Sequence, residues 1–314
     1  MKILLAIDGS VHSDNAVEAM LKQPWPDGSE CNVVTVSESF DSGNFGDLIN
    51  SIAIKAQEAF QTDIHKLLIE TRDKLEQKFG VGKVLITHLE GKPSERIIEE
   101  TRNWQPDLLV MGTPGTTGTG YNDQGGSIIN PVVNHVSCSV RIVNFITSYS
   151  LAKEEKAHLP LDQAERFLLA INDSPNSRAV IDSVMTRPFS PGSIFQVLSI
   201  VQEPKSVFHS RFFKDPQIDQ AHKMIYAAQK KTAEKLVENA ASKLESKFGK
   251  DKVTWHVLEG SVRSLILQIA QDWPADMIIL GAHDRDKSIL EHFLGSVAQA
   301  VVNNADCSVE IVRP

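Results

Sequence analysis

The strongest constraint on the fold is that the chain repeats itself. A shift of 169 positions places Trp104 on Trp273 and Gly112 on Gly281 without a gap. The same shift matches Glu90-Gly91 with Glu259-Gly260, Asp107 with Asp276, Gly126-Ser127 with Gly295-Ser296, and Cys138-Ser139-Val140 with Cys307-Ser308-Val309. Near the start the shift is 164, so the second copy is five residues longer between the positions answering to Val36 and Lys74. We predict a tandem duplication with domains at 1–146 and 164–314 and a linker at 147–163.

Each copy alternates short apolar runs with segments of helical period. The first copy predicts strands at residues 2–7, 32–36, 83–88, 107–111 and 140–145, and helices at 13–21, 48–79, 93–102 and 128–135. The second copy repeats this plan, with strands at 166–171, 195–201, 253–257, 277–280 and 309–312 and a long helix at 218–247. Leu48, Ile52, Ala56, Phe60, Ile64, Leu67, Leu75 and Phe79 mark the apolar face of the first long helix. The order predicts an α/β fold of two tandem open parallel five-stranded sheets, Rossmann-like, with helices on both faces.

A glycine- and threonine-rich loop follows the fourth predicted strand. It runs from Gly112 to Gly126-Ser127, immediately before the predicted helix at 128–135. Glycines let backbone N–H groups approach a phosphate, and the following helix directs its unpaired N–H groups and positive dipole end to the same place. This pattern indicates an anion site; a plain surface loop is the alternative, because glycine content alone is a weak motif.

Composition restricts the function further. The formal net charge is −8 and the pI is about 5.7, which argues against general binding of nucleic acid or anionic membranes. No apolar run approaches the roughly 20 residues that span a bilayer. Cys31, Cys138 and Cys307 are too few and too widely spaced for a disulfide framework or a metal motif. We expect a cytoplasmic protein with buried, reduced thiols.

Several of these motifs together resemble the universal stress protein family. They are the first strand with its Asp8-Gly9-Ser10 turn, the Gly-x-x-Gly loop, the Gly-Ser before the last helix and the Cys-Ser-Val before the last strand. The resemblance covers both halves and implies a stress-response protein with an adenine-nucleotide alpha hydrolase-like fold, which in many members binds ATP. It also implies an internal pseudo-dimer, with residues 140–145 against 309–312, and leaves further homo-oligomers open.

The resemblance assigns a nucleotide site to the first domain. Asp8 would meet the ribose or adenine, and the backbone of Val36 would hydrogen-bond adenine. Ala6 and Met111 would wall the base, Gly112 would lie beside the ribose, and Gly115, Gly126, Ser127 and Ile128 would hold phosphates. These positions lie at the ends of the first, second and fourth strands or in the following loop, where open α/β sheets bind ligands. Nucleotide-binding members have nine residues between Gly-x-x-Gly and Gly-Ser, whereas ten lie between Gly115 and Gly126.

The second copy departs further from the pattern. Asn172 replaces Asp8, and Asp284 stands where Gly115 would be. Two like charges about 4 Å apart oppose each other by roughly 4 kcal/mol at an intermediate dielectric. We therefore expect ATP, with or without Mg²⁺, in the first domain, and weak binding of the triphosphate or none in the second. Asp173, one residue along from Asn172, is the alternative that would partly replace Asp8.

Other chemistry has less support in the sequence. Metal-ligand side chains occur at His283, Asp284, Asp286 and His292, but without a metal-binding spacing. Ser10 with His12 is typical of a helix start and predicts Ser10 as the cap of the helix at 13–21. No Walker lysine follows the glycines and no general base lies near the phosphates, so we expect no catalysis. Three hypotheses remain: a nucleotide-binding stress protein, a scaffold or chaperone-like tandem without nucleotide, and a slow ATPase.

Residues 207–213 carry three phenylalanines and mark a contact loop or a small satellite core.

Overall fold

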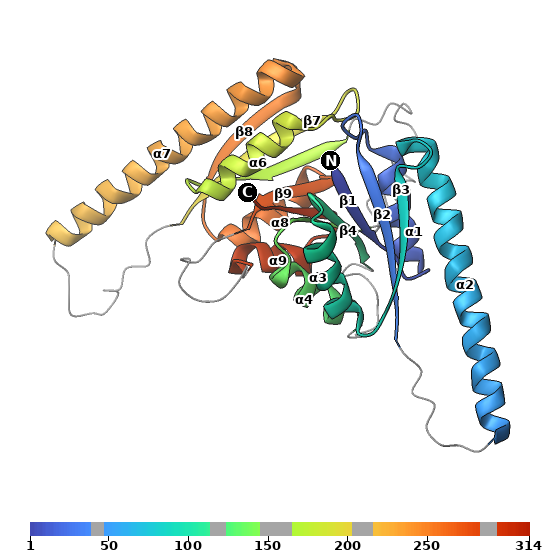
Figure 1. Ribbon diagram of the computed structural model, residues 1–314. Coiled ribbons are helices and arrows are strands. Elements are labelled where there is room, and N and C mark those ends of the chain that lie inside the picture. Colours follow the sequence, from blue (N-terminus) through green and yellow to red (C-terminus); the bar gives the residue numbers. More distant parts are fainter. Residues whose placement is uncertain (39–46, 114–123, 145–164, 203–215, 283–293) are drawn as a thin grey trace. The chain divides into compact units, whose positions relative to one another are not determined.

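The computed structural model describes residues 1–38, 47–113, 124–144, 165–202, 216–282 and 294–314. They form two compact units, the first within Met1–Ile146 and Arg285–Leu294 and the second within Thr147–Asp284 and Gly295–Pro314 (Figure 1). Each unit has a hydrophobic core of its own.

The first unit is a parallel sheet with helices on both faces. Its elements are β1 (Lys2–Ala6), α1 (Val11–Lys22), β2 (Glu30–Ser37), α2 (Asp47–Phe79), β3 (Val84–Glu90), α3 (Pro93–Trp104), β4 (Leu108–Thr113), α4 (Gln124–His135) and β5 (Ser139–Asn144). The strand order is β3-β2-β1-β4-β5, and every neighbouring pair is parallel. Helices α1 and α2 pack together on one face, and α3 and α4 on the other. The predicted fold class is confirmed.

The second unit has the same plan. Its elements are β6 (Arg166–Ala170), α6 (Pro175–Thr186), β7 (Ile194–Val201), α7 (Pro216–Phe248), η1 (Lys250–Lys252), β8 (Val253–Glu259), α8 (Val262–Asp272), β9 (Met277–Gly281), α9 (Ser296–Asn304) and β10 (Ser308–Val312). The order β8-β7-β6-β9-β10 is again parallel throughout. The segment between the second strand and the long helix comprises residues 38–46 in the first unit and 202–215 in the second. This difference accounts for the five extra residues of the second copy.

Each sheet buries one core against its first two helices. In the first unit this core includes Leu5 and Val33 from the sheet and Met20, Leu68 and Leu75 from the helices, all at most 2% exposed. The second unit has an aromatic counterpart, in which Phe167, Phe189, Phe195 and Phe248 stack or meet edge to face. The three cysteines are buried thiols outside any disulfide, as expected. Burial raises the pKa of Cys31 and Cys307 to about 12, so neither thiol ionises at neutral pH.

The long helices α2 and α7 run well beyond the strands that they cover (Figure 1). A helix of 33 residues is about 50 Å long, roughly twice the length of a strand of eight residues. The sequence predicts Phe60 on the buried face of α2, but its side chain is 52% exposed. That prediction is wrong because helical period alone does not reveal where the sheet underneath ends.

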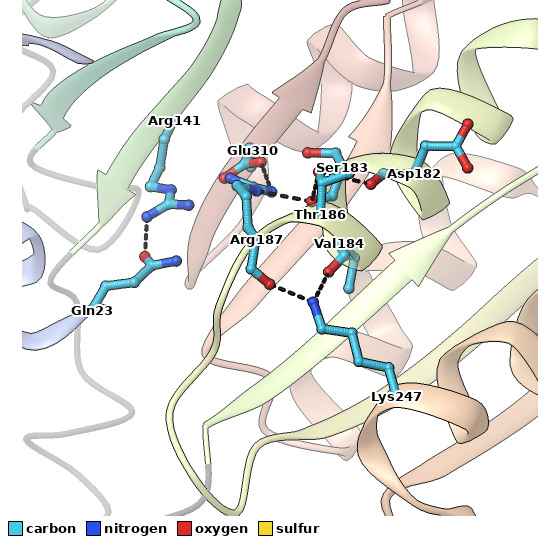
Figure 2. A network of polar contacts seen from close by, with 9 residues as sticks. All are labelled: Gln23, Arg141, Asp182, Ser183, Val184, Thr186, Arg187, Lys247 and Glu310. Carbon is cyan, nitrogen blue, oxygen red and sulfur yellow. Dashed lines mark hydrogen bonds and ion pairs between the residues drawn. The ribbon is translucent and has the colours of Figure 1, made fainter. Parts of the chain in front are cut away.

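A buried polar network joins α6 to the last strand of the second unit (Figure 2). Arg187 donates to Glu310 at 2.5 Å, with side chains only 7% and 0% exposed. The Lys247 ammonium donates to the carbonyl oxygens of Val184, Met185 and Arg187, at the end of α6. These carbonyls would otherwise lack helical partners. In the first unit Arg141 donates to Gln23 at the equivalent positions, so the two copies fill this place with different polar pairs.

Candidate functional site

The predicted adenine-contacting residues meet at one edge of the first sheet. Ala6 is the last residue of β1 and lies beside Val34 of β2 and Met111 of β4 in the strand register. The chain leaves β1 toward α1, and its neighbours on the two sides are β2 and β4. The edge is therefore a topological switch point, where open α/β sheets bind ligands.

Val36 presents open backbone at this edge. The amide of Ile7 donates to the carbonyl of Val34 at 2.9 Å, and the amide of Gly91 donates to the carbonyl of Ser37 at 2.9 Å. Backbone groups alternate sides along a strand, so Val36 shares the β1 side with Val34. Beyond the Ile7 amide, the described residues make no further hydrogen bond along this side of β2 to the N–H and C=O of Val36. A flat ligand with one donor and one acceptor fits such a pair of groups.

Asp8 follows directly and is held as a carboxylate. Its Oδ1 accepts the amide of Ser10 at 3.0 Å. Partial burial raises its pKa, but hydrogen bonds from Ser10 and Ser13 outweigh that effect and bring the pKa below 3.8. Ser10 caps α1, as predicted, and accepts from the amide of Ser13 at 3.3 Å. An ionised carboxylate only accepts hydrogen bonds, so Asp8 suits ligand hydroxyls or amines.

Gly112 is required for packing. A Cβ at this position would overlap the carbonyl oxygen of His12, a backbone atom that cannot rotate away. Gly281 is constrained in the same way, because a Cβ there would lie 2.9 Å from the backbone of Asn176. The glycine at the end of β4 therefore lets the start of α1 approach the strand. This packing accounts for a glycine at the same position in both copies, and no ligand is needed to explain it. Contact with a ribose stays a prediction.

The phosphate end of the first site is described only in part. Gly115 lies outside the described residues. Gly126 and Ser127 were expected to open the helix, but α4 begins at Gln124, so both lie within its first turn. Ile128 is half-buried in the same helix. The sequence pattern predicts the start of this helix too late, because the apolar residues of helical period begin only at Ile128 and the preceding glycines carry no side chain to show it.

The second unit has a cavity of about 260 Å³ at its corresponding edge. Its walls are aliphatic and come from strand ends and the starts of α8 and α9, including Ala170, Leu198, Ile200, Ile266 and Leu280. Ala170, Ile200 and Leu280 are the counterparts of Ala6, Val36 and Met111. Sequence reasoning missed this cavity because it stopped at Asp284, which lies outside the described residues. The matching aliphatic positions were the available signal.

A serine pair organises the polar rim of the cavity. Ser174 Oγ and Ser177 Oγ each lie 2.7 Å from Asn172 Oδ1. Ser177 Oγ also accepts the amide of Asn172 at 2.8 Å, and Ser174 Oγ accepts the amide of Ser177 at 3.3 Å. In the sequence alone, Asn172 is notable only because it stands where the first copy has Asp8.

The start of α9 supplies backbone donors. Gly295 is its N-cap, and the amide of Gln299 is the first to bond back, to the Gly295 carbonyl at 2.9 Å. The amides of Ser296, Val297 and Ala298 therefore have no intrahelical partner, and these residues line the cavity. Such donors at a helix N-terminus favour an anion or a strong acceptor.

Most of the other candidate groups lie outside the part of the chain that the structure describes. They are His283, Asp286, His292, the phenylalanines of 207–213, Phe145 and the predicted linker. Among the residues that are described, no three His, Cys, Asp or Glu side chains form a group that would hold a metal ion. The described helices include none that is long and apolar enough to cross a membrane.

Comparisons with known proteins agree with this architecture. A sequence model of the universal stress protein family matches residues 1–144 and again 164–313. Universal stress protein G of Salmonella typhimurium is 33% identical over 85 residues, which are 26% of this chain and 58% of that protein. The chain thus spans little more than half the length of that relative. A universal stress protein crystal structure from Archaeoglobus fulgidus has a TM-score of 0.56 at 18% identity, covering 99% of this chain and 96% of that one.

Proposed function

Because the chain belongs to the universal stress protein family, we propose that it is a stress-response protein that binds ATP in its first domain without turning it over. The observation that supports this is the edge beyond β1. There the free backbone of Val36, the Asp8 carboxylate and the aliphatic walls at Ala6 and Met111 converge. The backbone of Val36 would form hydrogen bonds with adenine, and the Asp8 carboxylate would accept a hydrogen bond from the ribose or the adenine amine.

Binding without turnover follows from what surrounds this edge. Among the described residues, His12 is the histidine closest in sequence to Asp8 and the first candidate for a general base. It lies at the start of α1, where its backbone carbonyl packs against Gly112. No lysine follows the glycines in the manner of a P-loop. Occupancy would then act by altering the conformation of the protein or a partner surface.

The first experiment identifies small molecules released when the purified full-length protein is denatured, followed by calorimetric titration with Mg-ATP. We expect about one adenine nucleotide per chain and hydrolysis no faster than in buffer. A protein that is empty and does not respond to ATP would favour the scaffold hypothesis, and steady turnover would favour the ATPase.

Two substitutions test the assigned residues. Asp8→Asn keeps the shape but removes the charged acceptor, so the affinity should fall roughly tenfold or more. Gly115→Asp should abolish binding of the triphosphate by repulsion. Asp14→Asn is the matched control, because Asp14 is an exposed carboxylate in the first turn of the same helix. Unchanged affinity in Asp8→Asn would show that the site is elsewhere.

We also propose that the two domains form the family's dimer within one chain. This rests on the internal repeat and on the resemblance. Light scattering should then give the mass of a single chain, 34.7 kDa, at micromolar concentration. A stable two-chain species would argue that each tandem chain needs a second one.

A further inference from the structure

The cavity of the second domain has a different chemistry from the first site. Among its described lining residues none carries a charge; the polar side chains are those of asparagine and serine. The first site instead places the Asp8 carboxylate at the matching position. The two copies thus offer a ligand the same aliphatic walls but different polar groups.

The hydrogen bonds fix which way the Asn172 amide faces. Ser174 Oγ and Ser177 Oγ each accept a backbone N–H, and each donates its own hydrogen to Asn172 Oδ1 at 2.7 Å, a distance typical of an O–H···O bond. The two hydroxyl oxygens also lie 3.3 Å from each other. The amide nitrogen Nδ2 remains, and it has no hydrogen-bond partner among the described residues. Asn172 is exposed at the cavity rim, so Nδ2 is available to a ligand.

The hydrogen-bonding polarity is therefore reversed between the copies. Asp8 presents only acceptors, whereas Asn172 presents only donors once its oxygen is occupied. The free amides of Ser296, Val297 and Ala298 add further donors at the other end of the cavity. A ligand whose hydroxyl or amine faced Asn172 would place a donor against a donor.

We propose that the second cavity binds a compact nucleoside-type ligand that presents a hydrogen-bond acceptor, a carbonyl or ester oxygen, where the first site takes a hydroxyl or amine donor. That the ligand is of nucleoside type rests on the proposed function. The reversed hydrogen-bonding polarity rests on the contacts of Asn172 alone. It agrees with the expectation that ATP is a poor ligand of the second domain. The acceptor would belong either to a keto base or to an esterified ribose.

The test is a calorimetric titration of the full-length Asp8→Ala variant, in which the first site lacks the carboxylate that would accept from AMP. The probes are AMP, IMP, which has a keto oxygen in place of the amine, and 2′,3′-cyclic AMP, which has ester oxygens in place of the ribose hydroxyls. We expect IMP or 2′,3′-cyclic AMP to bind about tenfold more tightly than AMP. Tighter IMP locates the acceptor on the base, and tighter cyclic AMP locates it on the sugar.

A second substitution, made in the Asp8→Ala background, replaces the hydrogen-bond donor at the rim of the second cavity with an acceptor. Asn172→Asp should reverse the ranking in favour of AMP, and hydrogen exchange of peptides covering Ser296–Ala298 should slow only with the preferred probe. Asp173→Asn, a neighbouring exposed carboxylate, is the control and should leave the ranking unchanged. An AMP preference, a ranking unmoved by Asn172→Asp, or no binding of any probe would overturn the inference. Wild-type titration with ATP reports the proposed function separately.

Discussion

Asp8 is ionised across the physiological range, and this has a measurable consequence. An acid whose pKa is lower in the folded state stabilises that state above its unfolded pKa, and the contribution is lost as the pH falls through the folded pKa. For Asp8 this window lies at and below the ordinary value of 3.8. Between pH 5 and 8 the carboxylate therefore offers the same acceptors.

We expect the ratio of ATP affinities between the wild type and Asp8→Asn to stay constant from pH 8 to pH 5. Taking the ratio cancels titration of the phosphates, which both proteins experience equally. The measurement is competition with a fluorescent nucleotide at each pH. A ratio that declined between pH 7 and 5 would mean that Asp8 is protonated there and that its hydrogen bonds from Ser10 and Ser13 do not persist.

At Gly112 the constraint is steric, because the end of β4 packs against the start of α1. Gly112→Ala places a methyl group onto the His12 carbonyl oxygen, so α1 must move from the sheet. We expect the free energy of unfolding to fall by about 3 kcal/mol, at the upper end for overpacking. The matched control is Gly28→Ala, which has φ of 73° but nothing within 4 Å and should cost about 1 kcal/mol. Urea unfolding of the first unit measures both, and equal losses would assign the cost to backbone strain.

At the scale of elements, the two copies satisfy the end of their first helix differently. Lys247 donates to three carbonyls at the end of α6, while in the first unit the Trp25 indole donates to the Met20 carbonyl at 2.8 Å. Burial and the nearby Arg187 lower the pKa of Lys247, so its charge is held at some cost. The hydrogen bonds and the contact with the Phe248 ring, 4.8 Å from Nζ, offset that cost.

Lys247→Met should therefore destabilise the last turn of α6 by about 1–2 kcal/mol, since the carbonyls lose a charged donor. Faster hydrogen exchange of peptides covering α6 measures this. Lys78→Met, at the equivalent position in the first copy, is the control and should leave α1 unchanged. Similar acceleration in both helices would show a general effect of losing a surface charge.

The long helices should divide into two parts with different stability. In α2 the side chains from Gln57 to Asp63 are exposed or half-buried, and burial begins at Ile64. In α7 it begins at Ala233. Local opening is cheap where few apolar contacts hold a helix. We expect hydrogen exchange roughly 100-fold slower after Ile64 and Ala233 than before them. Uniform protection along either helix would indicate that a partner covers its first half in solution.

At the scale of the whole molecule, the repeat explains why so much was predictable. Each strand predicted in one copy had a counterpart at the matching position of the other, which strengthened both predictions. The five extra residues lie in the segment between β7 and α7. Burial of Cys31 and the cap at Ser10 followed from local chemistry. Exposure of Phe60 and the start of α4 did not, because both depend on how far tertiary contacts extend along a helix.

The functional site was less predictable than the fold for a related reason. The family pattern identified glycines and Asp8 in the first copy, where the phosphate loop lies outside the described residues. The second cavity depends on Asn172, Ser174 and Ser177 acting together. A hydrogen-bond network assigns a side chain its direction only when all partners are placed in space, so a single sequence could not show it.

Each of the two units has its own core, so stabilisation by a ligand should be confined to the unit that binds it. A ligand that binds only the folded first domain stabilises that domain by about 2.7 kcal/mol at 100 times its Kd. Hydrogen exchange with saturating Mg-ATP should therefore slow in β1, β2 and β4, while β6, β7 and β9 keep their rates. Asp8→Asn at the same ATP concentration should lose about half of this stabilisation, because a tenfold weaker Kd leaves about 1.4 kcal/mol. Slowing confined to the second unit would contradict the assignment of ATP to the first domain, and equal slowing in both would mean that the second cavity accepts the triphosphate as well.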